Sequence, residues 1–181
     1  MCKRFAQVVY SKTTKLKELI LVKIRHIQPK DDPQLATIIR HLLKSFGLDK
    51  PGTAYFDPEL EHLSDYYAQS KKREYFVLVD DNDRVLGGNG IAEYDPQNGV
   101  AELQKLYISE SAQGNHMSFK LIDAALEFAK QAGYREVYLE THHDLAAAVH
   151  LYQRYGFRKL DGPLGGGEHS EMDIFFAYPL V

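Results

Sequence analysis

Apolar residues recur along the chain with two different periods, and these periods predict its elements. Spacings of three and four, which put apolar side chains on one face of a helix, begin near Asp31, Asp57, Met117 and Asp144. Short runs rich in valine, isoleucine and aromatic residues, bounded by Gly, Asp and Asn, predict strands instead. The predicted strands span 19–27, 73–79, 84–94, 100–108, 135–141, 157–160 and 172–180, and the predicted helices span 31–47, 57–69, 117–132 and 145–155.

Two turns organise the middle of the chain. The sequences DDND (80–83) and DPQNG (95–99) separate three predicted strands, and turns of this composition are typical of hairpins. These strands therefore form an antiparallel meander. No repeat and no Pro/Gly/Ser-rich linker interrupts the chain, so we expect one continuous domain over residues 20–181, preceded by an extension over residues 1–19.

The extension is basic, and its role stays open between a solvated tail, a strand at the sheet edge and an arm that touches an acidic partner. Its basic residues precede the first acid, Glu18, and are Lys3, Arg4, Lys12, Lys15 and Lys17.

Composition narrows the class of protein. The 181 residues are 44% hydrophobic and 26% charged, which is ordinary for one globular domain with a substantial core. A net charge of -3 gives no broad basic face, so nucleic acid is not expected as a partner. Cys2 is the single cysteine, so no internal disulfide can form, and no apolar run reaches the length of a membrane span. We therefore expect a cytoplasmic protein without a membrane partner.

The stretch SESAQGNHMSFK (109–120) joins a predicted strand to a predicted helix. The first N–H groups of a helix have no partner inside the helix and carry the positive end of its dipole, so they bind anions well. Gly114 can supply a position with positive φ, and we expect His116 and Ser118 to have helical φ and ψ, so that only the bulk of the imidazole crowds an anion. The alternative is an ordinary strand-to-helix turn without a ligand.

This stretch, a second motif and the element order together resemble the GNAT superfamily of acyl-CoA-dependent N-acyltransferases. Members carry Gln/Arg-x-x-Gly-x-Gly/Ala at the start of a long helix, and Gln113, His116 and Ser118 stand at the three motif positions here. The family's second signature, Leu-Tyr-x-x-x-Gly-Phe, is similar to LYQRYGF at 151–157. Leu145 stands where the family often has Asn. The likeness covers nearly the whole chain after about residue 20.

The resemblance implies a fold and a co-substrate. We expect an α/β (α+β) domain with a GNAT-like mixed, mostly antiparallel central sheet of about seven strands flanked by helices. Acetyl-CoA is the implied acyl donor, with its pantetheine arm paired to the main chain of Leu106, Tyr107 and Ile108. Its pyrophosphate would meet the N–H groups of the loop, whose residues are Gln113, Gly114, Asn115, His116, Met117 and Ser118.

Acetyl transfer from a thioester to an amine needs a base, a stabilised oxyanion and a proton for the departing thiolate. By resemblance to family members with a general-base glutamate, Glu102 is the candidate base; a solvated strand carboxylate is the alternative. Tyr152 matches the family's tyrosine that protonates the thiolate, and a core tyrosine is the alternative.

The acceptor is expected to meet the segment before the second predicted helix and the glycine-rich loop near the C-terminus. The candidate residues are Tyr55 and Asp57 in the first and His169 in the second. Asp57 can also be a helix cap. His142 and His143 suggest a metal, but neighbouring residues at a strand end point to opposite faces and no third ligand has chelating spacing, so no metal is expected.

The sequence favours an N-acetyltransferase that transfers an acetyl group from acetyl-CoA to a primary amine of a small molecule by direct attack. The chain offers no nucleophile for a covalent intermediate, since Cys2 lies in the extension. Two alternatives remain: a non-catalytic acyl-CoA-binding sensor, suggested by His116 and Leu145 at motif positions, and a protein or peptide N-acetyltransferase. A homodimer is left open.

Overall fold

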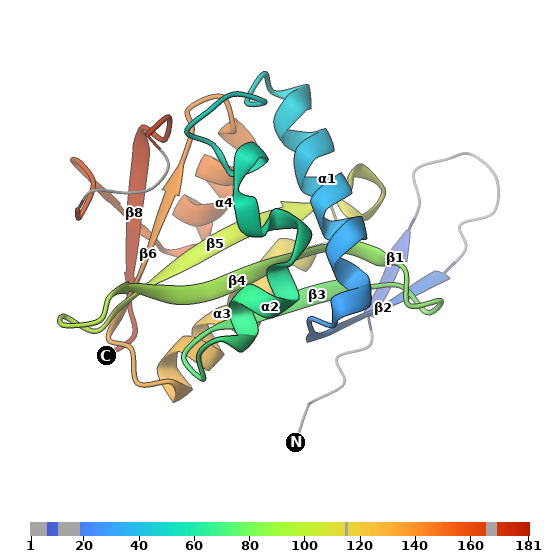
Figure 1. Ribbon diagram of the computed structural model, residues 1–181, viewed down its shortest axis with the longest axis horizontal. Coiled ribbons are helices and arrows are strands. Elements are labelled where there is room, and N and C mark those ends of the chain that lie inside the picture. The colour runs from blue at the N-terminus through green and yellow to red at the C-terminus, as the bar shows by residue number, and fades with distance from the viewer. Residues whose placement is uncertain (1–6, 11–18, 115, 166–169) are drawn as a thin grey trace.

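The computed structural model describes residues 7–10, 19–114, 116–165 and 170–181. Its described strands form one sheet of eight in the order β1-β2-β3-β4-β5-β6-β8-β7 (Figure 1). The strands are β1 (Gln7–Tyr10), β2 (Leu19–His26), β3 (Glu74–Val79), β4 (Val85–Asp95), β5 (Val100–Ile108), β6 (Glu136–Thr141), β7 (Arg158–Leu160) and β8 (Ile174–Pro179). The helices are α1 (Asp32–Ser45), α2 (Leu63–Ala68), α3 (Met117–Gln131) and α4 (Ala146–Tyr155).

The predicted fold class is confirmed. Neighbouring strands are antiparallel except β5 and β6, which are parallel. The seven predicted strands correspond to β2 through β8. The additional strand, β1, lies within the predicted extension and pairs antiparallel with β2, with Gln7 opposite Val22. This part of the extension therefore forms the edge of the sheet.

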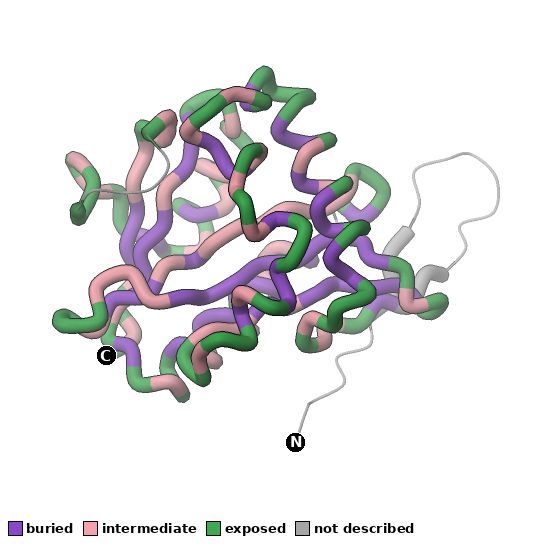
Figure 2. Tube along the Cα trace, in the orientation of Figure 1, coloured by how far each residue is buried: buried purple, intermediate pink, exposed green. Residues whose placement is uncertain are grey.

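Helices cover both faces of the sheet. In Figure 1, α1 and α2 lie in front of it, and α3 and α4 lie behind it. Under α1 and α2, residues such as Ile39, Leu63 and Val77 form one core, and under α3 and α4, residues such as Ile122, Val137 and Phe176 form another. Figure 2 shows the resulting pattern, in which the central strands are mostly buried and the turns at the surface are exposed. No helix among the described residues is long and apolar enough to cross a membrane.

The predicted helix over 57–69 is divided in two. A short 3-10 helix, Pro58–Glu61, is followed at His62 by α2, because the chain bends there to bury both Leu60 and Leu63. The start of α2 is capped from another element: the buried carboxylate of Asp32 in α1 accepts hydrogen bonds from the Ser64 N–H (2.9 Å) and the Ser64 hydroxyl (2.6 Å). Such a distant partner cannot be recognised from the helical period alone.

A β-bulge interrupts the pairing of β4 with β5. Gly88 lies opposite Tyr107 and Gly90 lies opposite Gln104, so one residue of β4 faces two residues of β5. The bulge contains Lys105, which has a φ of 51°, a left-handed conformation that is uncommon for a residue other than glycine. Because the bulge shifts the alternation of β5, the Gln104 and Lys105 side chains both reach elements on the α1–α2 face.

The sheet also forks. Within the described residues, β5 pairs with β6 only from Val100 to Glu102, although β5 continues to Ile108 and β6 to Thr141. Figure 1 shows β6 rising away from β5 beyond this short ladder. The fork opens a space within the sheet itself, between the ends of two strands.

Candidate active site

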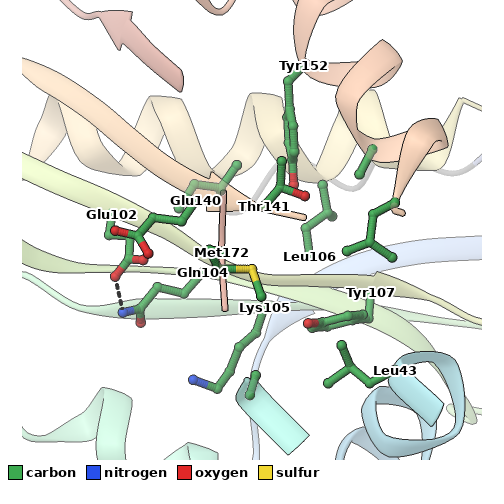
Figure 3. Close-up of a pocket in the computed structure, with 14 residues that line it drawn as sticks. Leu43, Glu102, Gln104, Lys105, Leu106, Tyr107, Glu140, Thr141, Tyr152 and Met172 are labelled. Carbon is green, nitrogen blue, oxygen red and sulfur yellow. Dashed lines mark hydrogen bonds between the residues drawn. The ribbon is translucent and has the colours of Figure 1, made fainter. Parts of the chain in front are cut away.

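A cleft occupies the fork between β5 and β6 (Figure 3). Residues from β5 line one wall, the end of β6 lines another, and side chains from α1 and α4 approach from opposite faces of the sheet. The lining residues are Leu43, Ala54, Glu102, Leu103, Gln104, Lys105, Leu106, Tyr107, Glu140, Thr141, Leu145, Ala148, Tyr152 and Met172. Both predicted catalytic residues, Glu102 and Tyr152, are therefore on the walls of one cleft.

Glu102 lies at the vertex of the fork, where it pairs with Tyr138 of β6. Its carboxylate accepts a hydrogen bond from the Gln104 amide at 2.7 Å, and the Gln104 amide oxygen accepts one from the Tyr67 hydroxyl at 2.9 Å. This chain of bonds fixes the side of the carboxylate that faces Gln104. Glu102 is thus a positioned carboxylate rather than a freely rotating surface group.

A second carboxylate lies beside the first. Figure 3 shows the side chains of Glu102 and Glu140 next to each other at one end of the cleft. Glu140 accepts a hydrogen bond from the Tyr138 hydroxyl at 2.9 Å. Two carboxylates at this end give the α1–α2 side of the cleft a negative potential that favours a cationic ligand.

Lys105 forms a buried ion-pair cluster next to these carboxylates. Its side chain is 4% exposed, and its ammonium lies 2.6 Å from Asp57 and 3.1 Å from Glu59. Burial alone would lower the pKa of the ammonium, but the two carboxylates outweigh burial and raise the pKa, so Lys105 is a cation at neutral pH. The cluster ties the bulge of β5 to the segment that precedes α2.

Tyr152 enters the cleft from the opposite side, on α4. Its ring packs on Phe157 and Phe176, with centroids 5.7 Å and 5.8 Å away, and Figure 3 shows it reaching down toward Thr141. Burial raises the pKa of its hydroxyl, so the group is protonated at neutral pH. The structure shows the core alternative for Tyr152, and the well-packed ring also places a protonated hydroxyl at the cleft, so the catalytic role stays a prediction.

The predicted phosphate loop precedes α3 as expected, with one correction. His116 is the N-cap of α3 and has a φ of 58° and a ψ of 17°, so the expected right-handed helical conformation is wrong. A β-carbon in this left-handed region meets the following carbonyl oxygen, at a cost of roughly 1–2 kcal/mol. Glycine at this position would therefore relieve backbone strain as well as bulk. The exposed His116 ring lies 6.1 Å from that of Phe119.

The other loop residues differ in their exposure. Gly114 has a φ of 80°, as predicted for one position of the loop, and a β-carbon there would meet nothing within 4 Å. The exposed Gln113 donates a hydrogen bond from its side chain to the Ile108 carbonyl at 2.9 Å. Met117 is buried, and Ser118 is half-buried in the first turn of α3. Asn115 lies outside the described residues.

Leu106 and Tyr107 line the cleft, whereas Ile108 closes β5 and packs on a third small core that includes Leu78 and Met117. Among the predicted acceptor residues, Asp57 is outside the lining and forms an ion pair with Lys105, which lines the cleft.

Tyr55 is half-buried against the core under α1 and is outside the lining. His169 lies outside the described residues.

His142 and His143 do not point to opposite faces. The strand ends at Thr141, and the chain then turns, with the Leu145 N–H donating to the His142 carbonyl at 3.0 Å. The turn brings the two imidazole rings to a centroid distance of 4.2 Å. The expectation failed because strand alternation does not extend into a turn.

The lining residues that were not predicted include every charged or amide side chain other than Glu102, namely Gln104, Lys105 and Glu140. The face that Glu140 occupies could have been predicted from the alternation of side chains along a strand. Glu140 follows Tyr138 by two positions on a predicted strand, so the two side chains share a face. The orientation of Lys105 could not be predicted, since the bulged strand β5 has no glycine, proline or asparagine near Lys105 to mark the bulge.

Comparisons with known proteins are consistent with this geometry. Residues 37–157 match the Acetyltransferase (GNAT) family. An uncharacterized N-acetyltransferase of Escherichia coli K12, YjgM, is 34% identical over 154 residues, which cover 83% of this chain and 90% of that protein. The crystal structure of a GNAT-family acetyltransferase from Staphylococcus aureus Mu50 has the same fold, with a TM-score of 0.79, 19% identity, and coverage of 88% of this chain and 99% of that one.

A further similar structure contains a ligand. It is yncA of Salmonella typhimurium, solved with its cofactor acetyl-CoA, with a TM-score of 0.68, 18% identity, and coverage of 88% of this chain and 94% of that one.

Proposed function

Because the chain belongs to the GNAT acetyltransferase family, we propose that it transfers an acetyl group from acetyl-CoA to the primary amine of a small molecule by direct attack. The observation that carries the proposal is the fork. It brings a positioned carboxylate, Glu102, and a protonated hydroxyl, that of Tyr152, to one cleft from opposite faces of the sheet.

The donor would lie along β5. Beyond Glu102, the main chain of Leu103–Ile108 has no strand beside it on the β6 side within the described residues, so an extended pantetheine arm can pair there. The strand leads directly to the turn before α3, whose first N–H groups suit the pyrophosphate. The arm and the anion would thus follow consecutive segments of the chain.

The acceptor would enter from the α1–α2 face. Glu102 takes a proton from the ammonium and releases it to water, and the neutral nitrogen attacks the thioester carbonyl carbon. The C–N bond forms and the C–S bond breaks, while a main-chain N–H of β5 near Leu106 stabilises the carbonyl oxygen. Tyr152 donates its proton to the departing sulfur, and the second proton, which the attacking nitrogen must lose to form the amide, passes through water and restores the Tyr152 hydroxyl.

The charge of this face supports a cationic acceptor. Glu102 and Glu140 line it together, whereas the cation of Lys105 is already paired with Asp57 and Glu59. An amine that arrives as an ammonium ion is attracted by the two carboxylates before it loses its proton.

One observation favours a second candidate, an acyl-CoA-binding sensor without turnover. His116 holds a strained backbone at the helix start, and its ring stands next to the proposed phosphate position. Turnover separates the two functions, since a sensor binds acetyl-CoA without releasing free thiol.

The test combines binding and turnover. Calorimetry with acetyl-CoA and with CoA should show saturable heat, and thiol release should follow with members of a panel of polyamines, amino acids, aromatic amines and short peptides. Binding without thiol release for any acceptor would favour the sensor. No heat at millimolar ligand would exclude both functions.

A further inference from the structure

The turn between β6 and α4 holds a compact group of metal-ligating side chains that the acetyl transfer does not use. It consists of His142, His143 and Asp144. One ligand atom from each residue can be chosen so that all lie within 4.8 Å of one another. The strand ends at Thr141 and α4 begins at Ala146, so the group spans the connection between two regular elements.

Two distances within the group are close to those between ligands of a tetrahedral site. His142 Nδ1 lies 3.3 Å from one oxygen of Asp144, and His143 Nε2 lies 3.4 Å from the other. Zn²⁺ binds nitrogen and oxygen at about 2.0–2.2 Å, so two ligands at a tetrahedral angle lie roughly 3.4 Å apart. The imidazoles already stand at ligand-to-ligand distances from the same carboxylate.

Hydrogen bonds set which nitrogen each ring presents. His143 Nδ1 lies 2.6 Å from the Asp173 carboxylate, which is a suitable acceptor for an Nδ1 proton and leaves the lone pair on Nε2, the atom that faces Asp144. A histidine held from behind by a carboxylate is the arrangement that commonly orients metal-binding imidazoles. On His142, Nδ1 accepts the Asp144 N–H at 3.2 Å, so this nitrogen is the acceptor of its ring, and a bound ion would replace that hydrogen bond at the same lone pair.

Charge and accessibility suit a cation. Asp144 and Asp173 place two carboxylates around the two imidazoles, and Lys50, whose charge acts on His143, is paired with Glu171 at 2.6 Å. His142 is buried, while His143 and Asp144 are exposed, so an ion can enter from solvent and keep water at the remaining positions.

We propose that His142, His143 and Asp144 bind one divalent transition ion of the zinc class, with Asp173 as the carboxylate that positions His143. Nitrogen and carboxylate ligands favour Zn²⁺ and its neighbours over Mg²⁺ and Ca²⁺, which prefer oxygen alone. The ion would hold the turn whose flanking residues, Thr141 and Leu145, line the cleft. The site is independent of the acceptor and of acetyl transfer.

Calorimetry of the full chain with ZnCl₂ at pH 7.5 tests the site. We expect one Zn²⁺ per chain, little response to Mg²⁺, and binding weakened about 10- to 100-fold in Asp173→Asn. His143→Ala should weaken it further, and His150→Ala, at an exposed position of α4, should leave it unchanged. Circular dichroism shows that each variant is folded.

A measurement on the unaltered protein makes the test independent of the variants. Zn²⁺ should shift the imidazole NMR resonances of His142 and His143 and leave that of His150 in place. The proposal is overturned if wild-type protein binds no Zn²⁺ at millimolar concentration, if His143→Ala binds as wild type does, or if the two turn histidines do not respond.

Discussion

The two sides of the cleft differ in how they are held. On the α1–α2 side, hydrogen bonds and ion pairs fix Glu102, Gln104 and Lys105, and the groups there are charged or amide. On the α4 side, Tyr152 is held by ring packing against Phe157 and Phe176, and its hydroxyl is the polar group that it presents. The contrast suits a reaction that removes a proton from a cation on one side and supplies a proton to a sulfur on the other.

The largest effect is expected at the acidic side. Glu102→Gln keeps the size of the side chain and removes its ability to accept a proton, so kcat/KM should fall about 10²- to 10⁴-fold, most at low pH where little neutral amine is present. Acetyl-CoA affinity, measured by calorimetry, should stay constant. Glu127→Gln, at an exposed position of α3, serves as the control. Wild-type turnover in Glu102→Gln would exclude the carboxylate as the base.

The ion-pair cluster tests what holds this side in place. Lys105→Met removes the cation and leaves Asp57 and Glu59 without it, so the free energy of unfolding should fall by about 3 kcal/mol. Lys50→Met, which breaks the exposed pair with Glu171, should cost less than about 1 kcal/mol. Urea denaturation measures both changes, and equal losses would mean that burial adds nothing to the Lys105 cluster.

The stability that Lys105 contributes should also depend on pH. The pKa of Lys105 is higher in the folded protein than in the unfolded chain. Its contribution to stability is therefore complete at a pH below the pKa of the unfolded chain, and it is lost as the pH rises through the pKa of the folded protein. The stability difference between wild type and Lys105→Met should therefore be constant near neutral pH and narrow only in strongly alkaline solution.

A smaller effect is expected at the packed side. Tyr152→Phe keeps the ring contacts and removes the hydroxyl, so turnover should drop roughly 10- to 100-fold with CoA affinity preserved. The deficit should shrink for acyl donors with better leaving groups. Tyr155→Phe, on the same helix with its hydroxyl bonded to Asp123, is the matched control. An equal loss for every donor would argue against protonation of the thiolate by Tyr152.

The smallest effect is expected at the start of α3. His116→Gly relieves the strain of the left-handed backbone in the folded protein, but it also raises the conformational entropy of the unfolded chain. Because these two effects oppose each other, the free energy of unfolding should change by less than about 1 kcal/mol. Acetyl-CoA should bind equally well or more tightly. A clear loss of acetyl-CoA affinity in His116→Gly, measured by calorimetry, would show that the imidazole contacts the ligand.

Local patterns sufficed for most of the fold. The helical period places α1, α3 and α4 within about two residues of their ends, and the glycines at 47, 133 and 156 all have positive φ where the helices stop. Patterns failed where a distant side chain decides the local structure. The start of α2 after His62 is capped by the Asp32 carboxylate, 32 residues from Ser64, and no periodicity reports such a partner.

The same limit applies to the site. Glu102 and Tyr152 could be named from motifs, but their common cleft depends on where β6 leaves β5. The sequence around Lys105 has the composition of a regular strand, so neither its left-handed backbone nor its partners Asp57 and Glu59 could be anticipated.

The fork also divides the sheet into two groups of strands. Among the described residues, three pairs, from Val100–Glu136 to Glu102–Tyr138, form the strand ladder between the five strands before the fork and the three after it. Beyond this ladder no strand pairing within the described ranges sets the width of the fork. Packing does so instead, because Leu103 of β5, Leu139 of β6 and Phe176 of β8 belong to one core under α3 and α4, and the cleft is therefore as rigid as that core.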